Sequence, residues 1–259
     1  MNVIQFNKFA KYHNDKNIFF CKTDYLPQLF NSLRNHTEPS VLISGNSDYP
    51  ITDALVRQAP LCLQRWFAQC VNSDHRILTA MPYGIENTED CKLKGHGVGH
   101  GRTFKVDMCA NPPIAEPTCS LYANFSLDTH PVRRPLYSMC QELDYITCDS
   151  AESHTKTNNR PYDDFVQKIL DHEMVVCPRG NAPAETHRFW EVLYLNRVPI
   201  IKLNKGNSFF TKLPVIVLND WAQIKDKKFI YQEYERVKNN SKEMLDMSYW
   251  EKLIENECE

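Results

Sequence analysis

The sequence has no excess of positive charge. Its 259 residues carry 30 Lys and Arg against 32 Asp and Glu, which gives a formal net charge of -2. A chain without a basic excess has no long-range attraction for nucleic acid or for an anionic membrane surface. We therefore expect no nucleic-acid partner.

Long apolar runs are also missing. No stretch approaches 18 apolar residues, so the sequence predicts no membrane span. Residues 1–17 lack an apolar core of signal-peptide length. Only 8 glycines are present, which excludes a glycine-rich fibrous protein, while 42% hydrophobic and 11% aromatic residues exclude a disordered chain. The sequence predicts a soluble globular protein.

The ten cysteines contain no CxxC pair and no dense cluster. In a chain of this length, scattered cysteines are typical of reduced, buried thiols. We therefore expect a cytoplasmic protein. The Asn-x-Ser/Thr matches at Asn35, Asn124 and Asn239 are interpreted as chance, because glycosylation there needs a secretory route.

The first half of the chain alternates strand-like and helix-like segments. An apolar run at 17–21 precedes an amphipathic stretch at 26–33, and a strand is expected at 41–43. Residues 59–69 show apolar positions at helical spacing, and another strand is expected from residue 76. This rhythm is typical of an α/β fold with a parallel sheet.

The second half repeats the rhythm more clearly and favours a doubly wound, Rossmann-like unit. Strands are expected at 121–127, 145–148, 174–177, 198–202 and 215–218. Helices are expected at 131–143, 161–170, 185–196, 229–238 and 242–254.

A glycine- and proline-containing stretch at 86–117 separates the two halves and is interpreted as a loop region. We therefore predict an amino-terminal domain at 1–115, a carboxyl-terminal domain at 116–240 and a closing helix at 241–259. Within the loop, His96 and His100 have a metal-ligand spacing for a helix, but the alternating glycines favour a flexible loop.

Residues 177–191 contain the most informative pattern, because they join the carboxyl end of a buried strand to a helix. Ligands of open α/β sheets bind at that edge. Asn181 can cap the helix, and the free backbone N–H groups at the start of that helix would attract phosphate. Arg179 and Arg188 offer donors to phosphate oxygens, and Glu191 can accept bonds from ribose hydroxyls. The alternative is that these arginines pair with Glu185 and Glu191 on a solvated helix face.

Two common nucleotide motifs are absent. The sequence contains neither a P-loop nor GxGxxG, so neither an NTPase nor an NAD enzyme is supported.

Four ordered blocks in the second half resemble the exostosin-like glycosyltransferases. The blocks are CPRGN at 177–181, ETHRFWE at 185–191, LNRVPI at 195–200, and LPV with DW at 213–221. Fainter blocks at 42–48, 66–69 and 81–86 resemble short bacterial and large-virus members of that family. Asn196 departs from the glycine that many members carry before the strand.

The resemblance implies a GT-B architecture, in which two Rossmann-like domains face a cleft. It implies transfer of a sugar from a UDP-sugar, with UDP-xylose favoured, to a glycan acceptor. By motif, the donor would contact the following residues, the last three more weakly supported: Arg179, Gly180, Asn181, Glu185, Thr186, His187, Arg188, Glu191, Asn124, Ser126 and Arg134. The alternative is a catalytically inactive carbohydrate- or nucleotide-binding protein of the same fold.

The mechanism implied is inverting and independent of metal and cofactor. Arginines and a helix N-terminus can stabilise the departing diphosphate, and no DxD-type acidic pair ends a strand in the second half. The acceptor hydroxyl must lose a proton to a base. Asp48, in a turn after an apolar strand, is the first candidate, although Asp is also common in turns for structural reasons. Glu86 is the second candidate.

Overall fold

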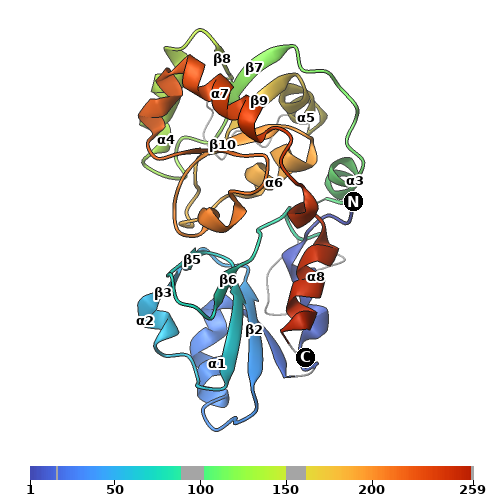
Figure 1. The fold of residues 1–259 in the computed structure, drawn as a ribbon, viewed down its shortest axis with the longest axis vertical. Coiled ribbons are helices and arrows are strands. Elements are labelled where there is room, and N and C mark those ends of the chain that lie inside the picture. Colours follow the sequence, from blue (N-terminus) through green and yellow to red (C-terminus); the bar gives the residue numbers. More distant parts are fainter. Residues whose placement is uncertain (16, 89–101, 150–161, 258–259) are drawn as a thin grey trace.

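The described part of the chain contains two large parallel sheets, seen in the lower and upper parts of Figure 1. The computed structural model describes residues 1–15, 17–88, 102–149 and 162–257. The first sheet has the strand order β1-β2-β4-β6 and the second β11-β10-β9-β7-β8, with every pairing parallel. The predicted α/β class with parallel sheets is confirmed.

The first sheet consists of β1 (Ile18–Lys22), β2 (Ser40–Gly45), β4 (Leu63–Ala68) and β6 (Leu78–Ala80). All six residues of β2 are buried, as expected for a central strand of a parallel sheet. The helical elements of this half are η1 (Phe6–Tyr12), η2 (Thr23–Tyr25), α1 (Leu26–Ser32) and α2 (Asp53–Val56). A separate two-stranded pair joins β3 (Ile51–Thr52) to β5 (Val71–Asn72).

The second sheet consists of β7 (Cys119–Ala123), β8 (Ile146–Cys148), β9 (His172–Val176), β10 (Val198–Lys202) and β11 (Ile216–Leu218). Its helical elements are α4 (Arg133–Gln141), α5 (Tyr162–Leu170), α6 (His187–Tyr194), η5 (Asn207–Phe210), η6 (Trp221–Lys225) and α7 (Lys227–Val237). Numbered from β7, the spatial order is 2-1-3-4-5, so the winding direction reverses between β7 and β9. Ligands of doubly wound sheets bind at such a reversal.

Two predictions about the first half are wrong. The segment 59–69 forms strand β4 instead of a helix, because Leu63, Trp66 and Phe67 are buried in a strand with neighbours on both edges. That tertiary environment outweighs the helical spacing of the apolar residues. The stretch 86–117 also contains a helix, α3 (Thr103–Ala110).

The start of the helix after β9 is also corrected. Helix α6 begins at His187 with Thr186 as N-cap, so Asn181 does not cap it. The preceding segment is irregular and passes through the interior, since Ala182, Ala184 and Glu185 are buried. Burial of these side chains fixes the chain before the helix starts.

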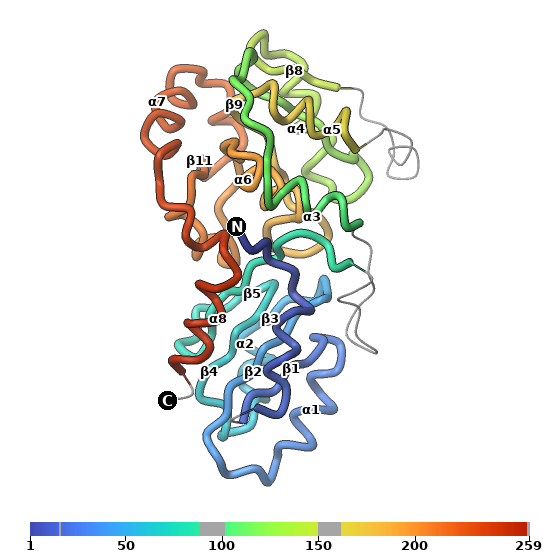
Figure 2. The backbone as a smooth tube through the Cα atoms, turned by 90° about the vertical axis from the view of Figure 1, so that its right-hand side faces the viewer, coloured from blue at the N-terminus to red at the C-terminus, as the bar shows by residue number. Residues whose placement is uncertain are grey.

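The carboxyl-terminal helix α8 (Met247–Asn256), which follows η7 (Glu243–Leu245), returns to the amino-terminal part of the chain (Figure 2). Lys11 pairs with Glu251 at 2.6 Å, and the hydroxyl of Tyr12 donates to Glu255 at 2.7 Å. Among the helices of the described residues, none has the length and hydrophobicity to cross a bilayer.

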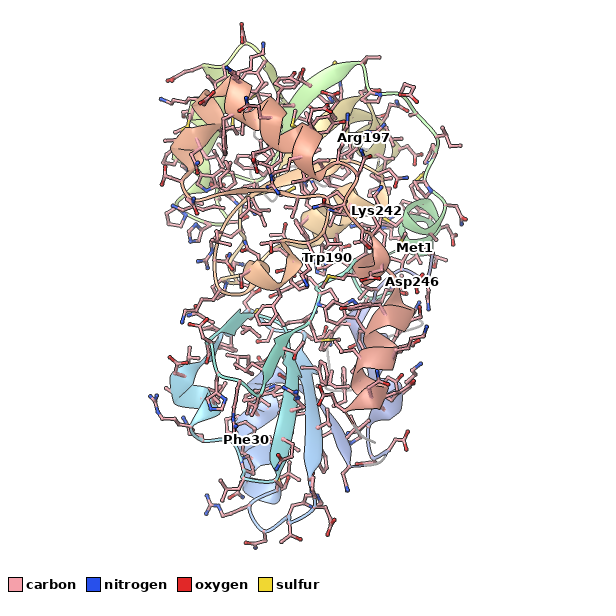
Figure 3. All side chains as sticks on the ribbon, viewed as in Figure 1. Met1, Phe30, Trp190, Arg197, Lys242 and Asp246 are labelled. Carbon is pink, nitrogen blue, oxygen red and sulfur yellow. The ribbon has the colours of Figure 1, made fainter. Side chains whose placement is uncertain are left out.

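An aromatic chain links α6, η5 and α8. The ring of Trp190, labelled in Figure 3, lies 5.0 Å from that of Phe210, which lies 6.2 Å from that of Trp250. All three are buried in the same hydrophobic cluster as Phe6 and Trp66 of the first half. One core therefore joins the first sheet to α6.

Candidate functional site

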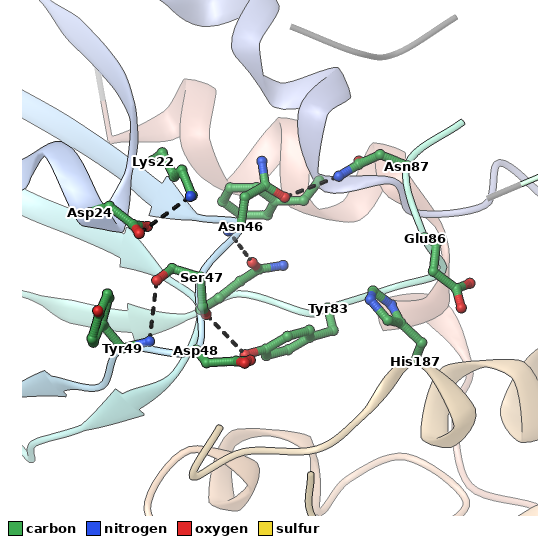
Figure 4. A pocket seen from close by; sticks show the side chains of 12 residues that line it. Lys22, Asp24, Asn46, Ser47, Asp48, Tyr49, Tyr83, Glu86, Asn87 and His187 are labelled. Atoms are coloured by element: carbon green, nitrogen blue, oxygen red, sulfur yellow. Dashed lines mark hydrogen bonds and ion pairs between the residues drawn. The ribbon is translucent and has the colours of Figure 1, made fainter. Parts of the chain in front are cut away.

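A pocket of about 560 Å³ lies at the carboxyl edge of the first sheet (Figure 4). Its wall comes from Phe6 of η1, from the ends of β1, β2, β4 and β6 with the residues that follow them, and from the first residue of α6. The lining includes the two predicted bases, Asp48 and Glu86, together with Asn46, Tyr49 and His187. The pocket is therefore built by segments far apart in the sequence.

The loop after β2 turns sharply at Asn46, whose backbone has a φ of 55°. Asparagine tolerates this left-handed conformation better than most residues. The side chain of Gln69 accepts from the Asn46 N–H at 2.8 Å and donates to the carbonyl of Pro82 at 3.0 Å. Gln69 thus fixes the loop that carries the predicted base.

Asp48 lies in that loop and lines the pocket with an exposed side chain. Its charge is one of the lesser causes that raise the pKa of Tyr83, after burial and the neighbouring Cys70. Asp48, the first candidate for the base, therefore lies where a ligand in the pocket could contact it.

Glu86, the second candidate base, also lines the pocket, but Lys105 of α3 forms an ion pair with it. Burial alone would raise the pKa of Glu86, and the charges of His187 and Lys105 outweigh it, so that the pKa falls to about 2. A carboxylate this acidic is a poor proton acceptor near neutral pH.

Lys105 contacts a second carboxylate, that of Glu191 in α6, at 2.5 Å. The hydroxyl of Tyr162 donates to the same Glu191 oxygen, Oε1, at 3.4 Å. Glu191 is 5% exposed. Lys105 therefore connects the pocket to α6, and a ribose contact by Glu191 remains a prediction.

Two other predicted donor residues, Glu185 and His187, connect the loop after β6 to α6. His187 Nδ1 lies 2.9 Å from the carbonyl of Gly84, and its ring packs edge-on against Tyr83. Glu185 is buried and accepts from the Tyr83 N–H and from Trp190 Nε1. Burial raises the pKa of Glu185 to about 7, against the lowering effect of these bonds.

The loops after β7 and β9 meet at the winding reversal of the second sheet, a place called the reversal site below, and Arg133, which is 7% exposed, connects them. Its guanidinium donates to the carbonyls of Arg179 at 2.8 Å, Ser126 at 3.0 Å and Pro178 at 3.2 Å. The loops after β7 and β9 are thereby tied together. Burial first, and then the charge of Arg188, lower the pKa of Arg133 to about 10.

Two further arginines belong to the reversal site. Arg179 donates to the carbonyls of Gly180 and Asn181, and Arg188 lies over the ring of Phe165. In the part of the chain that the structure describes, no carboxylate pairs with Arg133, Arg179 or Arg188. The alternative interpretation, in which Arg179 and Arg188 pair with Glu185 and Glu191, is not seen.

The reversal site also contains buried polar atoms that lack a hydrogen-bond partner among the described residues. These are Ser126 Oγ, Thr129 Oγ1 and Arg188 Nη1. A methyl group of Thr129 and one of Thr186 lie within 4 Å of where a Cβ on Gly180 would stand. Buried polar atoms are normally satisfied, so the cluster has the character of a site for a polar ligand.

Three weaker predictions concern the loop after β7 and the start of α4. Ser126 belongs to the reversal site, while Asn124 donates to the hydroxyl of Tyr122 at 2.9 Å. The side chain of Arg134 is 65% exposed and pairs with Asp128. The sequence pattern predicted Arg134, whereas its neighbour Arg133 is the buried arginine that joins the loops.

No group of three or more His, Cys, Asp or Glu within residues 1–15, 17–88, 102–149 and 162–257 is placed to hold a metal ion. His96 and His100 lie outside the described residues.

Comparison with known proteins adds no family assignment. No protein-family model matches the chain, and no curated protein matches it significantly. The resemblance to exostosin-like glycosyltransferases therefore depends on the sequence blocks alone.

Proposed function

We propose that this protein is a glycosyltransferase that moves a sugar from a UDP-sugar to a glycan acceptor. The observation that supports the proposal is the reversal site. There, within the described part of the chain, Arg133, Arg179 and Arg188 have no carboxylate partner and the hydroxyls of Ser126 and Thr129 have no hydrogen-bond partner. Such a site suits a diphosphate, because fork-shaped guanidinium donors match phosphate oxygens.

The donor diphosphate binds between the loops after β7 and β9. As the glycosidic bond breaks, negative charge grows on the departing UDP. Arg179 and Arg188 stabilise that charge, and Arg133 adds a buried positive charge behind them. The N-terminus of α6, which begins at His187, contributes its dipole at the same edge.

The acceptor occupies the pocket of the first sheet, and Asp48 removes the proton from its hydroxyl. Glu86 is disfavoured as the base because Lys105 holds its carboxylate and its pKa is about 2. This division of roles corresponds to a GT-B arrangement, with the acceptor on the amino-terminal domain and the donor on the carboxyl-terminal one. Attack by the acceptor from the side opposite the leaving UDP makes the reaction inverting.

The reaction as proposed requires no metal ion, because arginines neutralise the leaving group. Xylose is the favoured sugar, from the resemblance to large-virus enzymes. Activity should survive excess chelator; activity that disappears with chelator and returns with manganese would contradict this part of the proposal.

Two measurements test the proposal. UDP, GDP and CMP are titrated into the protein and thermal stabilisation is recorded, since a ligand bound only by the folded state raises the midpoint of unfolding. UDP should stabilise most. UDP release from UDP-sugars in the presence of glycan acceptors then separates a transferase from an inactive nucleotide-binding protein.

A further inference from the structure

The pocket of the first sheet differs in charge from the reversal site of the second. Its lining carboxylates are those of Asp24, Asp48 and Glu86. Lys22 pairs with Asp24 at 3.3 Å, and Lys105 pairs with Glu86. Among the described residues no cation pairs with Asp48, so an anionic ligand would meet its negative charge, and the pocket favours a neutral ligand.

Asn7, Asn46 and Asn87, from three separate segments, form a closed ring of hydrogen bonds at one wall of the pocket. Asn46 Nδ2 donates to Asn7 Oδ1, the Asn7 backbone N–H donates to Asn87 Oδ1 at 2.9 Å, and Asn87 Nδ2 donates to Asn46 Oδ1 at 3.0 Å. Asn46 and Asn87 line the pocket. The ring fixes which end of each amide is a donor, so it presents an ordered set of groups to a ligand.

Asn7 is 3% exposed and does not belong to the pocket lining, so it supports the amides of Asn46 and Asn87 from the interior. Asp24 adds a carboxylate to the lining. A sugar hydroxyl can donate to a carboxylate and accept from an amide N–H, which are the groups that the lining offers.

An exposed aromatic ring stands at the rim of the pocket. Tyr49 is 64% exposed and lines the pocket, as Figure 4 shows beside Ser47 and Asp48. The ring face carries negative potential, and the aliphatic C–H face of a pyranose carries weak positive potential. An aromatic ring beside ordered amides and a carboxylate suits a molecule with one apolar face and several hydroxyls.

We propose that this pocket is a subsite for an uncharged pyranose, which stacks on Tyr49 and is held through its hydroxyls by Asp24 and the amides of Asn46 and Asn87. Its assignment to the acceptor depends on the proposed function. It adds that the acceptor's terminal sugar is neutral and that Tyr49 determines its affinity.

The test is binding of neutral methyl pyranosides (glucoside, galactoside, xyloside and fucoside) to the UDP-saturated protein. Side-chain amide signals of Asn46 and Asn87 are followed by nuclear magnetic resonance. At least one pyranoside should shift these signals, and glucuronate should bind more weakly than the glucoside. Tyr49→Ala should weaken pyranoside binding about tenfold, as expected for the loss of one aromatic contact. Tyr49→Phe should not.

Tyr25→Ala is the matched control, because Tyr25 is 45% exposed and does not belong to the pocket lining. The inference is overturned if no pyranoside of the panel binds, if glucuronate binds better than the glucoside, or if Tyr49→Ala and Tyr25→Ala behave alike. Pyranoside binding that depends on Tyr49, without sugar transfer from any UDP-sugar, would support the subsite while removing the proposed function.

Discussion

His187 donates its Nδ1 hydrogen to the carbonyl oxygen of Gly84 at 2.9 Å, across 103 residues of sequence. A carbonyl only accepts, so Nδ1 of His187 carries a hydrogen. It ties the start of α6 to the loop that carries Glu86. The loop can make this approach because Gly84 has a φ of 61° and lies against the backbone of Ile4.

Gly84→Ala is expected to destabilise the protein by at least about 2 kcal/mol, because φ is positive and the new Cβ would stand 2.2 Å from the Ile4 carbonyl oxygen. Urea unfolding measures the change. Gly180→Ala is the control: its Cβ would meet nothing closer than 3.4 Å, so stability should change by less than about 1 kcal/mol. Equal effects of the two substitutions would contradict the geometry.

Arg188→Ala and Arg179→Ala should each weaken UDP binding roughly 10- to 100-fold, since each removes a charged hydrogen-bond donor from the diphosphate. Calorimetric titration measures the affinities. Arg134→Ala, beside the buried Arg133 but paired with Asp128 on the surface, should leave UDP affinity unchanged. If Arg134→Ala weakens UDP binding as strongly as Arg179→Ala and Arg188→Ala, the reversal site is not the donor site.

Asp48→Asn should reduce the rate of transfer by about 10²–10⁴-fold, the usual contribution of a general base, with UDP affinity unchanged. The amide keeps the side-chain volume but cannot take up the acceptor's proton. Asp53→Asn, an exposed site outside the pocket lining, is the control. Near wild-type turnover of Asp48→Asn would make Glu86 the next candidate for the base.

Lys105→Met should destabilise the protein by about 3–5 kcal/mol near neutral pH, because it leaves the carboxylates of Glu86 and Glu191 without their buried cation. The pKa of Glu86 is depressed to about 2 in the folded protein. Its stabilising contribution is therefore present above an ordinary value of 4.5 and is lost as pH falls toward 2.

Unfolding measured from pH 6 to pH 3 should thus show an acid-sensitive decline in the wild-type protein that is smaller in Lys105→Met. Lys105→Arg, which keeps the charge, should retain most of the stability. A parallel decline in Lys105→Met and wild type would contradict the ion pair.

The wild-type protein should lose stability as the pH rises, and Glu185→Gln should remove this loss. The pKa of Glu185 is raised to about 7 in the folded protein, so its contribution is complete below 4.5 and is lost as pH rises through 7. The difference amounts to on the order of 3 kcal/mol. Thermal unfolding from pH 4.5 to pH 8 should show the stability of the variant rising relative to the wild type; identical profiles would show that folding does not raise the pKa of Glu185.

The sequence by itself determined most of the local structure of the second half. Strand β10 was expected at its observed bounds, and α5 and α7 were expected within two residues of theirs, because their apolar periodicities agree with their burial. The arginines at 179 and 188 could be selected because they flank a strand-to-helix junction, and such junctions share one edge of a parallel sheet.

Only the tertiary structure decided the remaining features. β4 is a strand because β2 and β6 flank it, which no local pattern encodes. Lys105 acquires its role by lying between Glu86 and Glu191, and Asn7 by meeting Asn46 and Asn87. Which of Arg133 and Arg134 faces inward depends on the rotation of α4 against the sheet. These partners are brought together by long-range packing, whose free energy depends on groups that are far apart in the chain.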